Sequence, residues 1–366
     1  MSKLFKPFTL RSLTVRNRAW MAPMCQYSAA PTGAGTGTVN DWHVTHLAAR
    51  AAGGTGLILA EATAVSPEGR ITPYDLGLWN DTQADAFRRV TAFLKEQGAV
   101  AGIQLAHAGR KASTERPWVD RGAPIPADAP LGWTPVGPSP LPFSPASTVP
   151  EELTEDGIRR ITGEFADAAR RALAAGFEAV EIHGAHGYLL HQFLSPYSNR
   201  RTDAYGGSFE NRLRFPLEVV EAVRAVWPQD LPVLFRVSAT DWLSENAEDG
   251  REGWTADDTV ALAKELHARG VDLLDVSTGG NAPDARVPAA PGFQVPFAER
   301  VREETGMPVA AVGLITEPAQ AEEIVASGRA DAVLLGRQLL RDPYWARHAA
   351  EELGAGPYVP QPYHRS

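Results

Sequence analysis

Short apolar runs alternate with longer stretches of helical period along the whole chain. The runs are rich in Val, Ile, Leu and Ala, and they lack strict alternation of apolar and polar positions. This pattern is typical of strands that are buried on both faces of a parallel sheet. The predicted strands span residues 19–24, 56–62, 100–105, 179–183, 233–237, 273–277, 309–312 and 332–335.

Segments with helical period separate these runs. The predicted helices span residues 42–52, 83–97, 155–175, 209–226, 256–268, 296–304, 318–327 and 344–353. The residues placed as N-caps are Thr82, Thr154, Ser208, Thr255 and Thr316. Glycines follow several helices, at Gly53, Gly98, Gly176, Gly270 and Gly328. Eight strand–helix units in strict alternation predict an α/β fold, a single closed (β/α)8 TIM barrel rather than an open doubly wound sheet.

Two segments break the regular pattern. Residues 8–15 predict a small N-terminal hairpin that turns at Arg11 and Ser12 and closes the amino-terminal end of the barrel. Residues 116–150, after the third strand, hold ten of the 29 prolines and form a long loop, either a lid over the site or a disordered insert. No segment has the composition of an interdomain linker, so residues 1–366 are predicted to be one domain.

A glycine-rich stretch, Gly33-Ala34-Gly35-Thr36-Gly37, is the only candidate for a dinucleotide-binding turn. It follows Pro31 and Thr32 rather than a strand. Because such a turn must connect a strand to a helix, the stretch is interpreted as a flexible loop.

Composition narrows the function classes. The 366 residues have a formal net charge of −9, and the basic residues are scattered, which argues against nucleic acid or a membrane surface as a partner. Cys25 is the only cysteine, so no intrachain disulfide can form, and a reducing compartment is the simpler interpretation. Since no apolar stretch is long enough to cross a bilayer, a soluble cytoplasmic protein is expected.

The richest chemistry follows the fourth predicted strand, in residues 183–196. His183 and His186 lie three positions apart, and Tyr188 follows two further on. Barrel enzymes keep their reactive groups at the carboxyl ends of strands. Two hydrogen-bond donors that converge on one oxygen can polarise a carbonyl or nitro group, and a tyrosine can deliver a proton to an adjacent carbon.

Two other interpretations of these histidines stay open. His183, His186 and His191 could bind zinc, as in a metal-dependent lyase or hydrolase, although the usual glutamate and the i, i+4 spacing are missing. They could also be hydrogen-bonded core residues without a chemical role.

Further candidates lie at other strand ends. Cys25 follows Pro23 at the end of the first strand and is either a thiol at the mouth of the site or a small buried residue. Arg236, flanked by apolar residues in the fifth strand, needs an anion. That anion is either the edge of a reduced flavin or a buried Glu or Asp.

Glycines end the last two strands, at Gly313 and Gly336, and Arg337 follows. Barrels often bind phosphate at this position. Because no fingerprint for an ADP moiety exists, a flavin here would be FMN and not FAD.

Taken together, these segments resemble the Old Yellow Enzyme family of FMN-containing ene-reductases on β/α barrels. The resemblance runs from Leu4-Phe5-Lys6-Pro7-Phe8 to the end of the chain. It is most specific in the segment from His183 to Pro196, continuing through Asn199 to Arg212. Cys25 together with Tyr27 is similar to the bacterial thermophilic-like branch, because other branches have Thr in place of Cys25.

The resemblance implies a role for each matching residue. Ala22, Pro23, Met24 and Cys25 would line non-covalent FMN, Ala60 and Gln104 would contact its pyrimidine side, Arg236 would lie at N1/O2, and Gly313, Gly336 and Arg337 would hold the phosphate. His183 and His186 would bind the activating oxygen of the substrate, Tyr188 would donate the proton, and Tyr27 would contact the substrate. The implied reaction is ping-pong: NADPH or NADH reduces FMN, and an activated alkene then takes hydride from N5.

Arg365 stands where, in that branch, a C-terminal arginine enters the site of the partner subunit of a dimer. The alternative is a frayed tail. Relatives with an iron–sulfur cluster and an additional dinucleotide domain need a cysteine cluster, which a chain with one cysteine lacks. A flavin-binding module without catalysis is also possible in principle, but Tyr188 beside the histidine pair argues against it.

Overall fold

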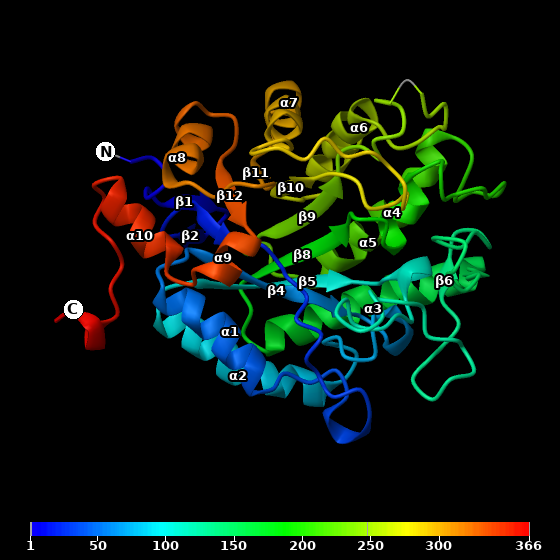
Figure 1. Ribbon diagram of the computed structural model, residues 1–366, viewed down its shortest axis with the longest axis horizontal. Coiled ribbons are helices and arrows are strands. Elements are labelled where there is room, and N and C mark those ends of the chain that lie inside the picture. The colour runs from blue at the N-terminus through cyan, green and yellow to red at the C-terminus, as the bar shows by residue number, and fades with distance from the viewer. Residues whose placement is uncertain (1, 247, 366) are drawn as a thin grey trace.

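Eight parallel strands close into a barrel in the computed structural model, which describes residues 2–246 and 248–365. Figure 1 shows these strands side by side at the centre of the molecule. Their order around the barrel is β10-β11-β12-β3-β4-β5-β8-β9. The bounds are β3 (Ala19–Met21), β4 (Leu57–Ala64), β5 (Val100–Ala106), β8 (Ala179–Gly184), β9 (Val233–Ser238), β10 (Leu273–Ser277), β11 (Val309–Ala311) and β12 (Ala332–Leu335). The predicted (β/α)8 barrel is therefore confirmed.

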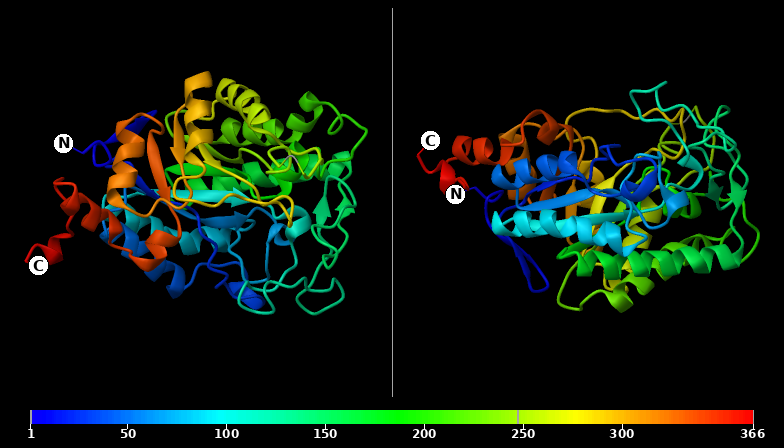
Figure 2. Two further views of the ribbon diagram at one scale, coloured as in Figure 1. Left: turned by 45° about the horizontal axis from the view of Figure 1, so that its top comes forward. Right: turned by 90° about the horizontal axis from the view of Figure 1, so that it is seen from below.

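Helices surround the barrel on its outside, as Figure 2 shows from two further directions. The predicted helices are present as α1 (Asp41–Ala52), α2 (Asp81–Glu96), α3 (Glu155–Ala174), α5 (Phe209–Val226), α6 (Ala256–Ala268), α7 (Val295–Thr305), α8 (Pro318–Ala326) and α10 (Trp345–Glu352). Two short helices were not predicted, α4 (Leu189–Leu194) and α9 (Arg337–Arg341). Both begin just after a strand, at the positions where the candidate chemistry lies. The described part of the chain has no helix that is both long enough and apolar enough to cross a membrane.

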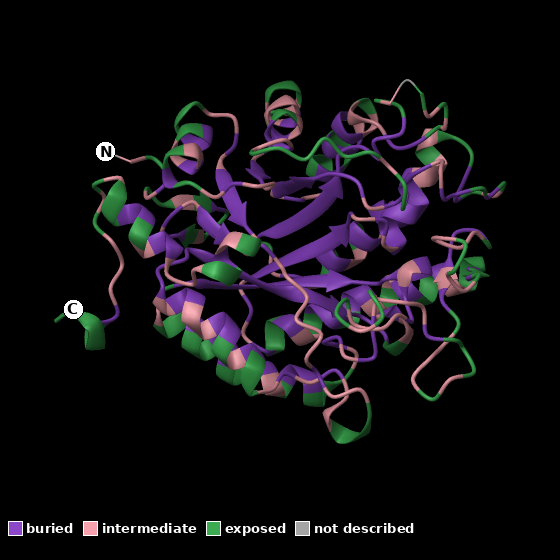
Figure 3. Ribbon diagram, in the orientation of Figure 1, coloured by how far each residue is buried: buried purple, intermediate pink, exposed green. Residues whose placement is uncertain are grey.

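Burial explains why the strands lack polar alternation. Figure 3 shows the barrel strands as buried, with exposed positions confined to helix faces and loops. One apolar cluster fills the space between strands and helices and includes residues from Leu4 to Ala349. Because this cluster runs through almost the whole chain, we propose that residues 1–366 form one domain.

A second apolar cluster fills the amino-terminal part of the barrel interior. It contains alternate strand residues such as Ala179, Leu234 and Leu273, which face inward. The predicted hairpin is present as β1 (Phe8–Leu10) and β2 (Leu13–Val15), paired antiparallel. Its Leu10 and Val15 belong to the same cluster. The hairpin therefore closes the amino-terminal end of the barrel with apolar side chains, as predicted.

The proline-rich segment is folded over the carboxyl end of the barrel. Beyond η3 (Gly109–Lys111) it contains β6 (Val136–Gly137), which pairs with β7 (Glu151–Glu152). Trp133 donates a hydrogen bond to Glu68 O at 3.0 Å, in η2 (Pro67–Gly69). Ser139 Oγ accepts one from Arg200 N at 2.9 Å. These contacts favour the lid over the disordered insert.

The glycine-rich stretch forms η1 (Gly33–Gly35), and Gly37 O accepts a hydrogen bond from Gly77 N. It is thus a short structured turn away from any strand end, which corrects the interpretation as a flexible loop and leaves no dinucleotide-binding turn there.

Three of the five N-cap residues predicted from the sequence are confirmed. Thr154, Ser208 and Thr255 each accept a backbone hydrogen bond at the start of a helix. Thr316 is one residue early, because Glu317 occupies the cap of α8. Thr82 is wrong for α2: the cap is Asn80, whose side chain accepts from Gln83 N at 3.0 Å, while the side chain of Gln83 accepts from Asn80 N.

This difference gives a stability test. Asn80→Ala removes the cap bond and should destabilise the protein by about 1 kcal/mol, lowering the thermal unfolding midpoint by about 1–2 °C. Thr82→Ala is the matched control, because Thr82 lies inside the first turn of α2. A midpoint lowered more by Thr82→Ala than by Asn80→Ala would contradict the assignment of the cap.

Candidate active site

His183, His186 and Tyr188 come together at the carboxyl end of β8. The ring of His183 lies 5.2 Å from the ring of His186 and 5.1 Å from that of Tyr188, both edge to face. His186 has a left-handed backbone with φ of 59°, and Gly187 follows with φ of 71°. A Cβ on Gly187 would lie 2.3 Å from Gly280 O, so only glycine allows the two loops to approach so closely.

Both histidines of the pair are neutral. Burial lowers the pKa of His183 and of His186 well below the ordinary value, and the positive charge of Arg236 lowers both further. The Nδ1 atom of His183 accepts a hydrogen bond from Ala185 N at 3.3 Å. A neutral imidazole has one N–H group, so the proton of His183 is on Nε2, which can donate to a ligand.

Two serines that the sequence analysis missed hold His186. The backbone N–H of His186 donates to Ser238 Oγ at 2.9 Å, and its Nε2 lies 2.7 Å from Ser277 Oγ. Ser238 ends β9 and Ser277 ends β10. Polar residues at the carboxyl ends of strands were the signal that could have identified them.

Lys111 is a third residue without a predicted role. Its Nζ donates to His186 O at 2.8 Å and to Gly280 O at 2.9 Å, and it lies 5.0 Å from the centre of the Tyr188 ring. Burial, reinforced by the nearby Arg110, lowers the pKa of Lys111 to about 7. The lysine therefore ties the loop after β8 to the loop after β10.

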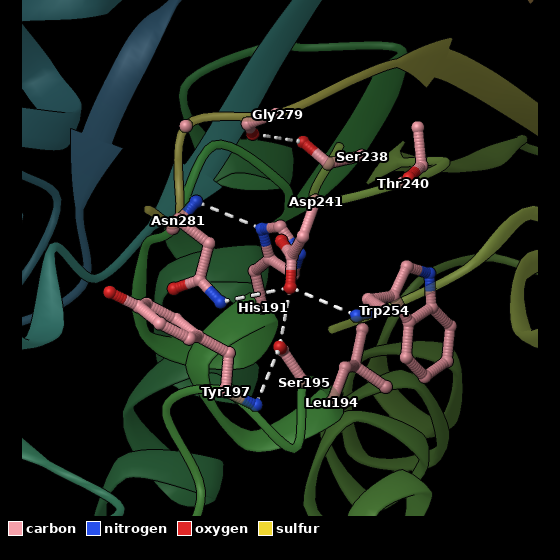
Figure 4. Close-up of polar contacts among 12 residues, drawn as sticks. His191, Leu194, Ser195, Tyr197, Ser238, Thr240, Asp241, Trp254, Gly279 and Asn281 are labelled. Atoms are coloured by element: carbon pink, nitrogen blue, oxygen red, sulfur yellow. Dashed lines mark hydrogen bonds and ion pairs between the residues drawn. The ribbon is translucent and has the colours of Figure 1, made fainter. Parts of the chain in front are cut away.

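His191 has a structural role in this loop, shown in Figure 4. Its Nδ1 accepts from Gly187 N at 2.9 Å, and its Nε2 lies 3.1 Å from Asp241 Oδ1. Asp241 Oδ2 also accepts from Ser195 Oγ at 2.5 Å and from Trp254 N at 2.9 Å. Both ring nitrogens of His191 are thus engaged by the protein.

The zinc interpretation consequently lacks its third ligand. No group of three or more His, Cys, Asp or Glu residues placed to hold a metal ion exists within residues 2–246 and 248–365. The interpretation of all three histidines as core residues holds for His191 only, because His183 and His186 face the site.

The end of β3 brings Cys25 and Tyr27 to the same mouth. Both are half-buried and hydrogen-bonded to each other through their side chains. Burial raises the pKa of the Cys25 thiol, with Asp75 and Glu61 adding to the effect. Tyr27 has a left-handed backbone with φ of 50°, and its ring lies 5.9 Å from that of Trp118 in the proline-rich segment.

Glu61 supports this turn from β4, where the strand register shifts between Ala60 and Ala62. Its carboxyl group accepts from Gln26 N at 2.9 Å. Burial raises the pKa of Glu61 to about 8. Ala60 was the only residue of this strand that the sequence indicated as a site residue.

Gln104 and Arg236 are buried inside the barrel, each held by a carboxyl group. The Nε2 of Gln104 donates to Glu181 Oε1 at 2.7 Å, and the Nε of Arg236 lies 2.9 Å from Asp275 Oδ2. The buried ion pair is therefore present. The two terminal nitrogens of Arg236 have no protein partner among the described residues, so this pair does not exclude a second anion.

A cavity of about 300 Å³ extends from His186 to the ends of β11 and β12. Its lining includes His186, Gly313, Gly336 and Arg337. A Cβ on Gly313, which has φ of 121°, would lie 2.7 Å from Gln294 Nε2. Among the described residues, Arg337 has no hydrogen-bond or ion-pair partner, so its guanidinium is free to meet an anion at the rim.

Met24 connects the first strand to this cavity. Its sulfur lies 3.8 Å from the position of a Cβ on Gly336. Ala22 is buried at the end of β3, and Pro23 lies half-buried between the two. The predicted residues of the first and last strands are thus neighbours at one end of the barrel.

Arg365, unlike the other predicted site residues, does not lie at the carboxyl end of the barrel. It is exposed, and the tail before it runs along the amino-terminal side of the barrel. There the hydroxyl of Tyr358 donates to Gln97 Oε1 at 3.2 Å, and Arg16 stacks on the Tyr358 ring at 4.0 Å. Arg365, just after η4 (Gln361–Tyr363), is therefore not brought to the site of its own chain.

The site fits a flat, phosphorylated cofactor. Arg236 presents unpaired terminal nitrogens inside the barrel, glycines leave room in the cavity wall, and Arg337 stands unpaired at the rim. These are the donors that an electron-rich heterocycle edge and a phosphate require.

Known proteins with similar sequences cover the whole chain. A model of the NADH:flavin oxidoreductase / NADH oxidase family matches residues 3–355. An NADPH dehydrogenase of Geobacillus thermodenitrificans is 48% identical over 99% of this chain and 98% of its own. One from Listeria innocua is 46% identical over 100% of this chain and 99% of its own.

Solved structures show the same fold. Morphinone reductase is 30% identical with a TM-score of 0.77, over 99% of this chain and 92% of its own. An old yellow enzyme homologue from Zymomonas mobilis is 26% identical with a TM-score of 0.77, over 98% of this chain and 97% of its own. With these relatives and a family match over nearly its full length, the chain belongs to the NADH:flavin oxidoreductase / NADH oxidase family and is an FMN-dependent, NAD(P)H-dependent oxidoreductase of the Old Yellow Enzyme type.

Proposed function

We propose that this enzyme reduces the activated C=C bond of α,β-unsaturated carbonyl or nitro compounds. The observation that carries the proposal is the cluster in which the His183 ring lies 5.2 Å from that of His186 and 5.1 Å from that of Tyr188. His186 lines the cavity that Arg337 also lines. Two neutral donors beside a phenol suit a substrate that needs its oxygen polarised and its carbon protonated.

We assign the residues that would hold FMN from the resemblance to the family, and three of them, Gly313, Gly336 and Arg337, line the cavity. Gln104 and Arg236 would hold the pyrimidine edge of FMN, and Gly313, Gly336 and Arg337 would hold its phosphate. The flavin ring would be lined by Ala22, Pro23, Met24, Cys25 and Ala60. When bound, FMN would supply hydride-transfer chemistry, with NADPH or NADH as the source of the hydride. Relatives named NADPH dehydrogenase and a morphinone reductase structure in complex with tetrahydroNAD support a nicotinamide donor.

The histidine pair binds the carbonyl or nitro oxygen of the substrate. Because the pKa values of both histidines are lowered, both rings act as neutral N–H donors rather than as acids. Negative charge grows on the substrate oxygen as the β-carbon accepts hydride. Each well-placed donor stabilises such charge by about 3–4 kcal/mol.

Tyr188 delivers the proton to the α-carbon. Burial raises the pKa of Tyr188 well above its ordinary value, with Cys25 and Asp75 adding to the effect, so the phenol stays protonated until it is needed. The Nζ atom of Lys111 lies over the Tyr188 ring, 5.0 Å from its centre. Tyr27 contacts the substrate at the mouth.

We further propose a cytoplasmic homodimer, or a dimer of such dimers, in which Arg365 enters the partner's site. The single cysteine supports a reducing compartment. The tail lies on the amino-terminal side of its own barrel, so a contribution of Arg365 to catalysis needs a second copy.

The first test is alkene reduction itself. Purified enzyme with bound FMN should oxidise NADPH when cyclohexenone is present. His183→Ala and His186→Ala should each lower kcat/KM for cyclohexenone by about 10²–10³-fold, because each removes one donor to the charged oxygen. His348→Ala, on the exposed face of α10, is the control and should keep full activity. Loss of less than tenfold in both histidine variants would count against the proposal.

Tyr188→Phe tests proton delivery separately from hydride transfer. It should slow reoxidation of the reduced enzyme by cyclohexenone by about 10²–10⁴-fold, while reduction by NADPH in stopped flow stays within about threefold of the wild type. Tyr205→Phe, which removes a hydroxyl bonded to Glu218 outside the site, is the matched control. Equal slowing of both half-reactions would indicate a damaged site rather than a missing proton donor.

Subunit mixing tests Arg365. His183→Ala and Arg365→Ala chains are each expected to be impaired alone. In a mixed dimer, the chain with an intact His183 receives Arg365 from its partner, so activity should recover in proportion to the mixed species. Absence of recovery, with mixed dimers verified by mass, would leave the tail without a role in the site.

A further inference from the structure

Four polar side chains form a continuous row across neighbouring strands inside the barrel. Gln104 on β5 donates to Glu181 on β8 at 2.7 Å, and Arg236 on β9 pairs with Asp275 on β10 at 2.9 Å. The carboxyl groups of Glu181 and Asp275 interact with each other, which joins the two halves, and Glu181 Oε2 and both oxygens of Asp275 accept no hydrogen bond from any other described residue. All four are at most 6% exposed.

The row lies directly above the apolar layer of the barrel interior. Ala179, Leu234 and Leu273 belong to that layer, and two residues later on the same strands come Glu181, Arg236 and Asp275. Since side chains two apart on a strand face the same way, the row faces the carboxyl end, where the cavity opens.

The two carboxyl groups share one proton. A single guanidinium cannot neutralise two carboxylates, and two buried like charges in contact strongly disfavour joint ionisation. Burial raises the pKa of Glu181 well above its ordinary value, and the charge of Asp275 raises it further. Burial raises that of Asp275 only to about 6, because Arg236 opposes the shift. Glu181 therefore keeps the proton and donates it to the Asp275 carboxylate.

This arrangement determines what the row presents to a ligand. Because the amide nitrogen of Gln104 is bonded to Glu181, its carbonyl oxygen remains as an acceptor. Because the Nε of Arg236 faces Asp275, its terminal nitrogens remain as donors. An acceptor next to donors matches an imide edge, in which an N–H group stands beside a C=O group.

We propose that Glu181 and Asp275 are positioning residues, a carboxyl pair with one shared proton that orients Gln104 and offsets the charge of Arg236 beneath the flavin pyrimidine ring. This inference rests on the proposed placement of that ring. The pair keeps the row at zero net charge, and so limits how strongly Arg236 favours the reduced, anionic flavin.

The experiment compares two variants with bound FMN. Glu181→Gln mimics the protonated acid, since its amide can still accept from Gln104 and donate to Asp275; the midpoint potential of bound FMN should stay as in the wild type. Glu181→Gln combined with Asp275→Asn removes both ionisable groups and leaves Arg236 uncompensated. Reduced FMN should then bind at least about tenfold more tightly relative to oxidised FMN, a rise of about 30 mV for a two-electron couple.

Asp331→Asn is the matched control. Asp331 is also paired with an arginine, Arg302 at 3.1 Å, but it lies at the amino-terminal end of β12. Its removal should leave the potential unchanged. A potential raised by Glu181→Gln alone would mean that Glu181 is ionised, and an unchanged potential in the double variant would mean that the pair does not offset Arg236; either result overturns the proposal.

Infrared spectroscopy gives a second readout that does not need activity or FMN. In the difference spectrum of wild type minus Glu181→Gln, the band of one protonated carboxyl group should remain, because the buried Glu61, whose pKa is raised to about 8, contributes equally to both proteins and cancels. A difference spectrum without this band would overturn the proposal even if the double variant failed to fold. Failure of the enzyme to oxidise NADPH with cyclohexenone would instead defeat the proposed function and leave the proton on Glu181 untouched.

Discussion

A charged arginine inside a parallel barrel is the constraint on which the site depends. Arg236 is buried directly above an apolar layer of the barrel interior, so its charge must be met by a neighbour. Asp275 on the neighbouring strand β10 forms an ion pair with the Nε atom of Arg236. Burial lowers the pKa of His183 and His186, and the charge of Arg236 lowers both further, which keeps both rings neutral. Burial together with one buried cation thus favours neutral donors above the row.

Neutral groups dominate the remainder of the site for the same reason. Burial shifts the pKa of Lys111 downward and those of Glu61, Tyr188 and Cys25 upward, in each case toward the uncharged form. A site lined by neutral donors can respond to charge that develops on a substrate without strong competing charges of its own. The apolar layer and the hairpin at the amino-terminal end keep water from the other side of these groups.

The barrel was predictable because its signals are local. Apolar runs and helical period lie in neighbouring residues, and all eight strand–helix units follow from them. The N-cap of α2 could not be predicted in this way. Asn80 and Thr82 are both good cap residues, and only the path of the chain selects between them. His183, His186 and Tyr188 were found because they are close in sequence. Lys111 and Asp275 were missed because their contacts depend on strand register and loop paths, which one sequence does not encode in any local pattern.

The two ends of the barrel have separate tasks, and this limits how the tail can act. Parallel strands place every carboxyl end on one rim, where the proline-rich lid also lies. The segment after α10 lies at the other, amino-terminal end of the barrel, where Tyr358 contacts Arg16 and Gln97. An arginine at residue 365 would have to cross the length of its own barrel to reach the cavity. Since only His364 separates Arg365 from η4, the remaining tail is too short for that crossing, and a functional Arg365 requires the barrel of a neighbouring subunit.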